Sequence, residues 1–243
     1  MWTLLAASAT DLSAVASAEA DRQSRTFALP STRTLTLDMT VGDLTIVGSD
    51  RTDARIDINR RAPSETGLAR IPVTFEETAD ALRVRAVQSN GDTNPALRSD
   101  ITLDVPRDAR LGPVNVVEGR VTLRGLRGSI ALAVRRGPIH ATDVSGSVRL
   151  ETEIGHLTVD KTKLSDAGVL RLRTFNGDIT LTLAERPANA RILALALNGT
   201  IQSDIPLNTK DKWGPRSGEA TLGRGEPVIS LDVVTGRIEI RSP

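Results

Sequence analysis

The sequence predicts an all-β protein, a single domain folded as a β-solenoid. Two observations predict it. Beyond residue 30, hydrophobic and polar residues alternate in short runs that are separated by Gly, Asn, Asp or Pro. Within residues 118–159, glycines recur nine residues apart, at Gly119, Gly128, Gly137, Gly146 and Gly155. A fixed period that returns the same strand pattern is typical of stacked repeats.

The first 25 residues have features of an export signal. Residues 4–18 are rich in Ala and Leu, and Ala16-Ser17-Ala18 has the small-x-small form of a signal-peptidase site. No basic residue precedes this run, and Asp11 interrupts it. We therefore expect residues 1–25 to be a truncated signal peptide, the alternative being a disordered leader. No later segment has the roughly 18 apolar residues of a membrane span.

Alignment of the repeats separates two kinds of strand. Gly128-Ser129 matches Gly146-Ser147 but not the intervening units, so the true period is about 18 residues, lengthening to about 22 in later coils. Two inward-facing sets result. The second residues after the corner glycines are Val121, Ile139, Leu157, Ile179, Ile201 and Ile238, and the fourth are Leu123, Ala141, Val159, Leu181, Ser203 and Ile240. The preceding strands contribute Ile130, Leu132, Val148, Leu150, Leu170, Leu172, Ile192, Ala194, Ile229 and Leu231.

These patterns divide the predicted domain, residues 26–243, into two parts. Residues 26–105 form divergent first coils and one cap, with Pro63, Pro72 and Pro95 in their connections, and residues 106–243 carry the regular repeats with a loop insertion at 204–225. The chain stops directly after the strand pattern "GRIEI". Because an uncovered strand edge pairs readily with another chain, we expect the insertion or a partner chain to cover this last coil. Self-association through a solenoid end is the corresponding prediction.

Several stretches carry a family resemblance, among them "SDITLDVPRDARL", "VSGSVRLET", "TFNGDITLTL" and "VISLDVVTGRIEI". Their recurring element is a turn followed by alternating aliphatics, most complete at Asn176-Gly177-Asp178-Ile179. Over residues 31–242 the chain resembles the bacterial β-strand-repeat family labelled "putative adhesin", a head-GIN-like domain family of unknown function. The resemblance implies an elongated right-handed β-helix, exported to the periplasm, the cell surface or the extracellular space. The family motif is structural, so it implies no catalytic residues.

Composition excludes several classes of function. The net charge is +1, and aromatic residues make up 2% with no Tyr, which argues against nucleic-acid binding and against stacking clefts for sugars. The absence of Cys excludes disulfides, zinc thiolate sites and thiol catalysis. No cofactor is expected.

The outward positions offer few candidates for catalysis or metal binding. Glu151 and Glu153 are two apart on one strand and share a face, which we interpret as a solvent-facing charged strand. His140 and His156 fall in neighbouring coils, but only Asp143 or Glu151 could supply a third ligand, without recognisable spacing. We therefore predict neither a catalytic nor a metal site.

Three further features concern binding. Asp43 and Asp178 follow glycine, but a calcium-binding repeat needs such an Asp in every coil. Trp213, in the insertion, is expected to anchor that loop, the alternative being contact with a sugar. A local basic strip could bind anionic polysaccharide, lipopolysaccharide or lipid headgroups, the alternative being ordinary solvated decoration. It comprises Arg120, Arg124, Arg127, Arg135, Arg136 and Arg149.

The sequence thus predicts a non-catalytic exported module for cell-envelope or surface binding, with envelope polysaccharide or another envelope protein as partner. One alternative is a carbohydrate-active β-helix enzyme, a polysaccharide lyase or hydrolase. Two carboxylates about 5–10 Å apart in an outward groove would favour that alternative. Another is an envelope-stress regulatory accessory protein.

Overall fold

The computed structural model describes residues 19–89, 91, 93–163, 168–210 and 214–243. The strands of this part of the chain form one 19-stranded sheet, and helix α1 (Glu65–Ala69) is a single short turn. The predicted all-β class is confirmed. Among the described residues, no helix has the length and apolar character needed to cross a membrane.

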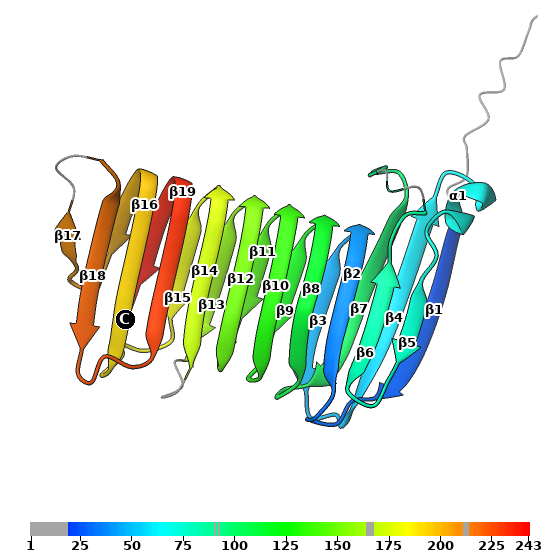
Figure 1. The fold of residues 1–243 in the computed structure, drawn as a ribbon, viewed down its shortest axis with the longest axis horizontal. Coiled ribbons are helices and arrows are strands. Elements are labelled where there is room, and N and C mark those ends of the chain that lie inside the picture. The colour runs from blue at the N-terminus through cyan, green and yellow to red at the C-terminus, as the bar shows by residue number, and fades with distance from the viewer. Residues whose placement is uncertain (1–18, 90, 92, 164–167, 211–213) are drawn as a thin grey trace, which may run out of the picture.

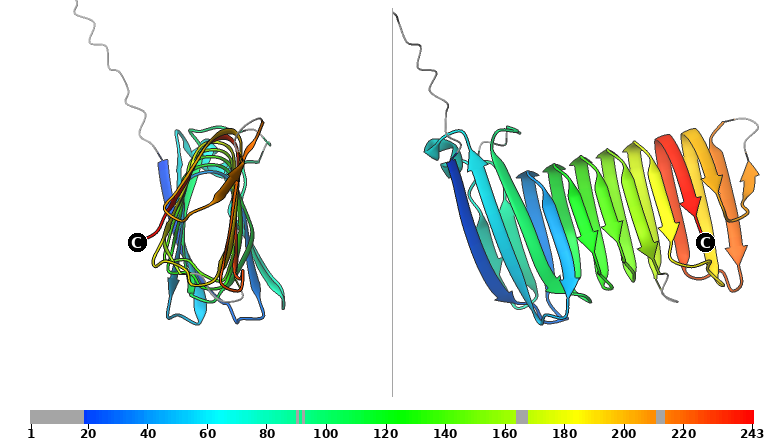
Figure 2. Two further views of the ribbon diagram at one scale, coloured as in Figure 1. Left: turned by 90° about the vertical axis from the view of Figure 1, so that its left-hand side faces the viewer. Right: turned by 180° about the vertical axis from the view of Figure 1, so that it is seen from behind.

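The sheet is folded into two facing rows of strands (Figure 1). In hydrogen-bonded order, row A contains β5 (Thr74–Glu77), β6 (Ala81–Ala86), β2 (Thr34–Val41), β8 (Arg110–Glu118), β10 (Ser129–Arg136), β12 (Ser147–Ile154), β14 (Val169–Asn176), the first part of β19 (Val228–Arg241), the first part of β16 (Ala190–Ser203), β18 (Arg216–Leu222) and β17 (Asn208–Lys210). Row B contains β1 (Glu19–Ala28), β4 (Asp53–Ala62), β7 (Arg98–Pro106), β3 (Leu44–Ser49), β9 (Val121–Arg124), β11 (Ile139–Thr142), β13 (Leu157–Thr162), β15 (Ile179–Leu183) and the second parts of β19 and β16. Viewed along the stack, the two rows enclose a flattened interior (Figure 2).

The two inward-facing residue sets predicted from the repeats fill this interior. Ile130 pairs in register with Val148, and Val148 with Leu170, so each strand places its aliphatic residues beside those of the next. Nearly every predicted core position is at most 3% exposed, and the core runs continuously through the stack. Ile201 and Ser203 are the exceptions, because their segment of β16 is the last strand of row B and is covered on one side only.

The order of strands in space differs from their order in the chain at both ends. C-terminal β19 lies between β14 and β16 in row A, and between β15 and β16 in row B. Likewise β2 and β3 lie between β6 and β7 on one side and β8 and β9 on the other. The prediction that the C-terminal strand forms the end of the stack is therefore wrong. Ile229 illustrates the reason. It pairs in register with Leu170 on one side and with Ile192 on the other, so β19 fits between two earlier strands as well as it would at the end.

Antiparallel strands instead lie at both ends of row A and at one end of row B, and the row B part of β16 stays uncovered at the other. Residues 204–225, predicted as a loop insertion, contain β17 and β18, and β18 pairs with the row A part of β16. At the other end β1 pairs with β4 along its whole length. Residues 19–25, assigned from the sequence to the leader, therefore belong to the sheet, whereas residues 1–18 lie outside the described residues. Helix α1, capped by the Ser64 hydroxyl, carries Leu68 against a small cluster of Ala62, Ile71 and Leu97.

The corner glycines form one column between the rows. Gly137 has φ +143°, and a Cβ built there would lie 1.9 Å from the carbonyl oxygen of Gly119. The same contact, at 1.7–2.1 Å, repeats at Gly119, Gly155, Gly177, Gly199 and Gly236. Because these oxygens belong to the backbone of the neighbouring strand, no side chain can be accommodated without separating the strands.

Gly137→Ala should therefore lower the free energy of unfolding by about 3 kcal/mol or more, since it adds a backbone clash to an unfavourable φ. Gly214→Ala is the matched control, because Gly214 also has positive φ (+89°) but nothing within 4 Å of the added Cβ. It should cost only about 1 kcal/mol of backbone strain. Urea unfolding measures both, and equal losses would show that crowding in the column is unimportant.

The internal position of β19 predicts its hydrogen-exchange behaviour. Amides of residues 229–233 should exchange as slowly as those of residues 130–134, because both segments are paired on two sides. Amides of β17, which lies at the edge of row A, should exchange much faster. Native-state exchange read by mass spectrometry tests this, and rapid exchange throughout β19 would contradict the strand order.

Candidate functional site

The outer face of row A contains a groove that crosses β8, β10, β12 and β14. Its volume is about 380 Å³. Two ranks of outward side chains form its walls, and it is lined by Asn115, Val116, Ala133, Val134, Arg135, Glu151, Thr152, Glu153, Arg173 and Phe175. The site is therefore a shallow channel on a sheet face and not an enclosed cavity.

Ala133 creates the hollow. It lies in register between Asn115 on β8 and Glu151 on β12, and Arg173 follows on β14. The methyl group of Ala133 is far shorter than these neighbouring side chains, so the row of outward side chains is lowest at β10. Because successive strands are about 4.8 Å apart, the four strands give the groove a length of about 14 Å.

Charged side chains of both signs line the groove. Arg135 Nε lies 3.7 Å from Glu153 Oε2, a loose and exposed pair, and just outside it Arg136 lies 3.2 Å from Glu118. Arg173 has Glu151 as its register neighbour on one side and Asp232 on the other, but it forms no ion pair with any described residue. These polar groups are available to a ligand at little cost, since exposed pairs contribute little stability.

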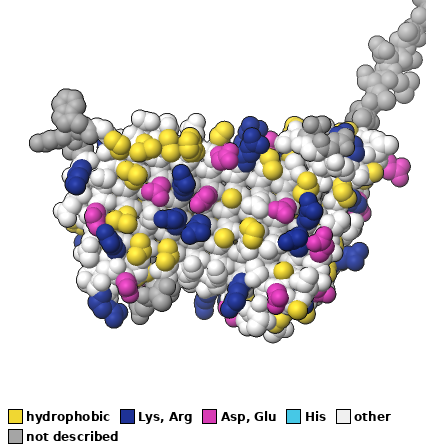
Figure 3. All heavy atoms as spheres, in the orientation of Figure 1, with side chains coloured by type: hydrophobic (Ala, Val, Ile, Leu, Met, Phe, Trp, Pro, Cys, Tyr) yellow, Lys and Arg dark blue, Asp and Glu magenta, His cyan; other side chains and the backbone are white. Residues whose placement is uncertain are grey.

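Phe175 is the most exposed large hydrophobic residue of the described chain, at 57%. It closes one end of the groove and begins an apolar ledge along row A. The ledge comprises Phe175, Val234, Leu197, Leu195 and Leu193. Figure 3 shows hydrophobic side chains gathered over the same ends of β14, β19 and β16. Composition counted against a stacking cleft, but it could not show where a single phenylalanine would lie.

The predicted basic strip is split by the fold. Arg124 belongs to row B, on the opposite side of the molecule from Arg135, Arg136 and Arg149, and Arg120 lies at the corner between β8 and β9. In place of the strip, Arg149 lies in register beside Arg171, two residues before Arg173. The basic cluster of row A thus consists of Arg149, Arg171 and Arg173. The predicted strip did not include Arg171 and Arg173, because they belong to a later repeat.

Glu151 and Glu153 share a face, as predicted, and both line the groove. Residues two apart on a strand have Cα atoms about 6.6 Å apart, within the range that would favour a carbohydrate-active enzyme. Both carboxylates rise from one strand in the same direction, however. Glycosidases place their two carboxylates on either side of the scissile bond, and a single strand beneath the ligand cannot do so.

The two histidines each meet one carboxylate. His140 Nε2 lies 3.8 Å from Asp160, and His156 Nδ1 lies 3.5 Å from Asp178. Asp143 and Glu151, considered as third ligands, are placed elsewhere, at a turn and on row A respectively. Among the described residues, no group of three or more His, Cys, Asp or Glu side chains is arranged to hold a metal ion.

Asp43 and Asp178, which follow corner glycines, bind backbone and so brace the stack. Asp43 Oδ1 accepts the N–H of Arg120 at 3.0 Å, and Asp178 Oδ1 accepts the N–H of Arg237 at 2.8 Å. His156 Nδ1 accepts the N–H of Asp178 in the same way, at 3.1 Å. Each side chain thus connects its corner to the corner of the neighbouring unit. The sequence identified these positions but not this role.

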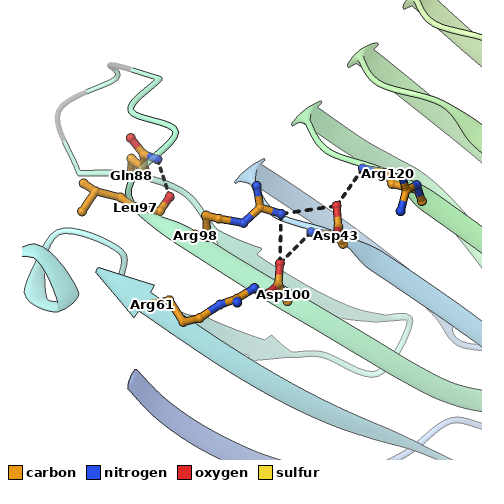
Figure 4. Close-up of polar contacts among 7 residues, drawn as sticks. All are labelled: Asp43, Arg61, Gln88, Leu97, Arg98, Asp100 and Arg120. Carbon is orange, nitrogen blue, oxygen red and sulfur yellow. Dashed lines mark hydrogen bonds and ion pairs between the residues drawn. The ribbon is translucent and has the colours of Figure 1, made fainter. Parts of the chain in front are cut away.

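A polar network surrounds the first of these corners (Figure 4). Asp100 accepts the N–H of Asp43 at 2.9 Å and pairs with Arg61, while Arg98 lies 3.3 Å from Asp43 and 3.4 Å from Asp100. Beside it, buried Gln88 donates to the carbonyl of Leu97 at 2.9 Å. Every carboxylate in this network is matched by a donor of the chain itself, so we assign it a structural role.

Asp21 fastens β1 to β4, its neighbour in row B. Its carboxylate accepts bonds from the guanidinium of Arg60 and from Gln23 at 3.0 Å, and Arg60 also donates to the carbonyls of Leu68 and Ile71. The Arg60 guanidinium, helped by the Gln23 amide, holds the pKa of Asp21 below its usual value of 3.8. This contact ties the edge strand to the segment around α1.

No family model matches the chain, and no curated protein matches it. The fold is similar to that of a solved structure from Clostridium sporogenes named a "putative cell adhesion protein", with a TM-score of 0.54 and 11% identity over 93% of this chain and 100% of that one. A structure from Bacteroides fragilis named a "putative adhesin" aligns over 92% of this chain and 97% of its own, at 14% identity and a TM-score of 0.37. The first similarity establishes a shared fold.

Trp213, a further candidate from the sequence, lies outside the described residues.

The lowered pKa of Asp21 predicts a pH-dependent contribution to stability. The contribution is fully present above pH 3.8 and is lost as the pH falls through the lower folded-state pKa. Asp21→Asn should therefore lower the urea midpoint slightly at about pH 7, and the difference from the parent should shrink at about pH 3. Asp108→Asn, at an exposed residue, is the control, and a difference independent of pH would contradict the assignment.

Proposed function

We propose that the protein is a non-catalytic binding module that captures its ligand in the row A groove. The observation that supports this most is the groove itself, in which an exposed aromatic ring, two guanidinium groups, two carboxylates and an amide converge. Open sites that combine an apolar surface with a few convergent polar groups are typical of ligand binding.

We further propose that the two rows are the faces of a single-domain, right-handed β-solenoid. The parallel registers that repeat from β8 to β15 support this description, as does the column of corner glycines. A solenoid presents a flat, regular face on which each repeat contributes equivalent positions, so substitutions there change the surface without changing the fold.

We propose an adhesin-like role at the cell envelope, after export to the periplasm or beyond. The similarity to a structure named a "putative cell adhesion protein" supports it, together with the family resemblance of the repeats. The partner would be envelope polysaccharide or another envelope protein. Self-association through an end of the stack is also proposed, with β1 and β5 exposed at one end and β17 and the row B part of β16 at the other.

A carbohydrate-active enzyme is the second candidate, because Glu151 and Glu153 lie together in the groove. Binding is favoured over catalysis because both carboxylates project from the same side of a ligand, and because the groove is shallow and open to water. Incubation with polysaccharide and measurement of new reducing ends or unsaturated products distinguishes the two, and product formation abolished by Glu151→Gln would establish the enzyme.

Filling the groove should abolish binding. Ala133→Trp places a large ring where the rank of side chains dips, and Ala133 is exposed, so the substitution should leave the fold intact. We expect the variant to lose at least about tenfold in affinity for purified bacterial cell envelopes in a sedimentation assay. Arg124→Trp, on row B, is the matched control. Equal binding by parent and both variants would place the binding surface elsewhere.

A further inference from the structure

The ligand class can be inferred from an imbalance of charge beside the groove. Arg149 and Arg171 are register neighbours on β12 and β14, and like charges at such positions destabilise a sheet. Arg171 has Ser230, not a carboxylate, on its other side. Arg149, Arg171 and Arg173 form no ion pair with any described residue, although Arg33, Arg60 and Arg61 each have a carboxylate partner. A guanidinium cluster whose members form no ion pair with the described residues is suited to an anionic ligand, although Glu151 and Asp232 are register neighbours of Arg173.

The groove also favours a chain-like ligand that lies along the stack. Its walls repeat at each strand, so a linear molecule would meet Asn115, Ala133, Glu151 and Arg173 in succession over about 14 Å. The basic cluster flanks one wall of this path, and Phe175 stands at its end. A compact ligand would use only one of these positions.

Phe175, Glu151 and Glu153 further restrict the chemical class of the ligand. The exposed ring offers an apolar surface to the C–H face of a sugar, while Glu151 and Glu153 can accept hydroxyl hydrogen bonds. The surroundings therefore suit a chain whose units carry hydroxyl groups as well as an acidic group.

We propose that the row A groove binds a linear acidic glycan, a polysaccharide with carboxylate-bearing sugar units, through the Arg149–Arg171–Arg173 cluster, the groove carboxylates and Phe175. The proposal rests on the function proposed above and specifies its ligand. Arg173 is placed to hold a sugar carboxylate inside the groove, and Arg149 and Arg171 to hold the next acidic unit at its rim.

Calorimetric titration of the whole chain with a galacturonic acid tetramer tests the proposal, with maltotetraose as the neutral probe. The acidic oligomer should bind and the neutral one should bind at least about tenfold more weakly. Arg171→Ala or Arg173→Ala should weaken binding about tenfold or more, and Phe175→Ala about fivefold. Raising sodium chloride from about 0.05 to about 0.5 M should also weaken binding of the acidic oligomer to the parent protein.

Two matched variants serve as controls, both at exposed positions outside the groove. Arg124→Ala removes an arginine from row B, and Leu195→Ala shortens an exposed side chain of the ledge. Both should retain affinity within about twofold, and circular dichroism should show all variants folded. Equal affinity for both oligomers, or unchanged affinity in the Arg171 and Arg173 variants, would overturn the acidic-glycan assignment.

The outcomes also separate this proposal from the one on which it rests. If Ala133→Trp abolishes envelope binding but neither oligomer binds, the groove is a binding site and the ligand class is wrong. If envelope binding survives Ala133→Trp, the proposed function itself fails. Saturable binding of a phosphate-rich polymer in place of the uronate would likewise overturn the ligand class.

Discussion

The structure depends on the close approach of backbone at one corner of every unit. Along that corner six glycines each lie against the carbonyl of a neighbouring glycine, and Gly42 lies against that of Ser99, with no room for a Cβ. The spacing of the strands in both rows follows from this contact, because a wider corner would break the parallel ladders on either side of it. Buried threonines strengthen it, since the Thr152 and Thr174 hydroxyls each donate at 3.1 Å to a corner carbonyl, of Gly137 and Gly155 respectively.

This constraint explains why the strand content and the interior could be predicted from sequence. A period of two assigns each residue to the inside or the outside, and the glycines fix where the assignment restarts. Every predicted interior residue from Val121 to Leu181 is buried in the structure. Because the units resemble one another, the sequence could not predict their order in space. Ile229 is as suitable a neighbour for Leu170 as Ile192 would have been, so alternation alone cannot decide which strand is inserted between them.

The candidate site was predictable only in part, for a related reason. Alternation correctly places Glu151 and Glu153 together, because they belong to one strand. The basic cluster and the groove arise between strands, where Arg149 meets Arg171 and Ala133 meets Glu151. Proximity in the sequence instead grouped Arg149 with Arg124, which the fold places on the opposite row. In stacked repeats, chemical neighbours are about one repeat apart, and proximity along the chain misleads.

The division between corner and face has a consequence for binding. The corner side chains, such as Asp43 and Asp178, form hydrogen bonds with the neighbouring unit. The strands between corners are therefore held at fixed spacing. Side chains on row A therefore occupy a surface whose backbone does not need to be ordered when a ligand arrives. Only the rotamers of exposed groups such as Arg173 and Phe175 must be fixed, and that cost is modest for each side chain. A shallow groove on this fold can thus reach useful affinity through repetition along the stack, where each further unit adds contacts without adding a new ordering cost for the backbone.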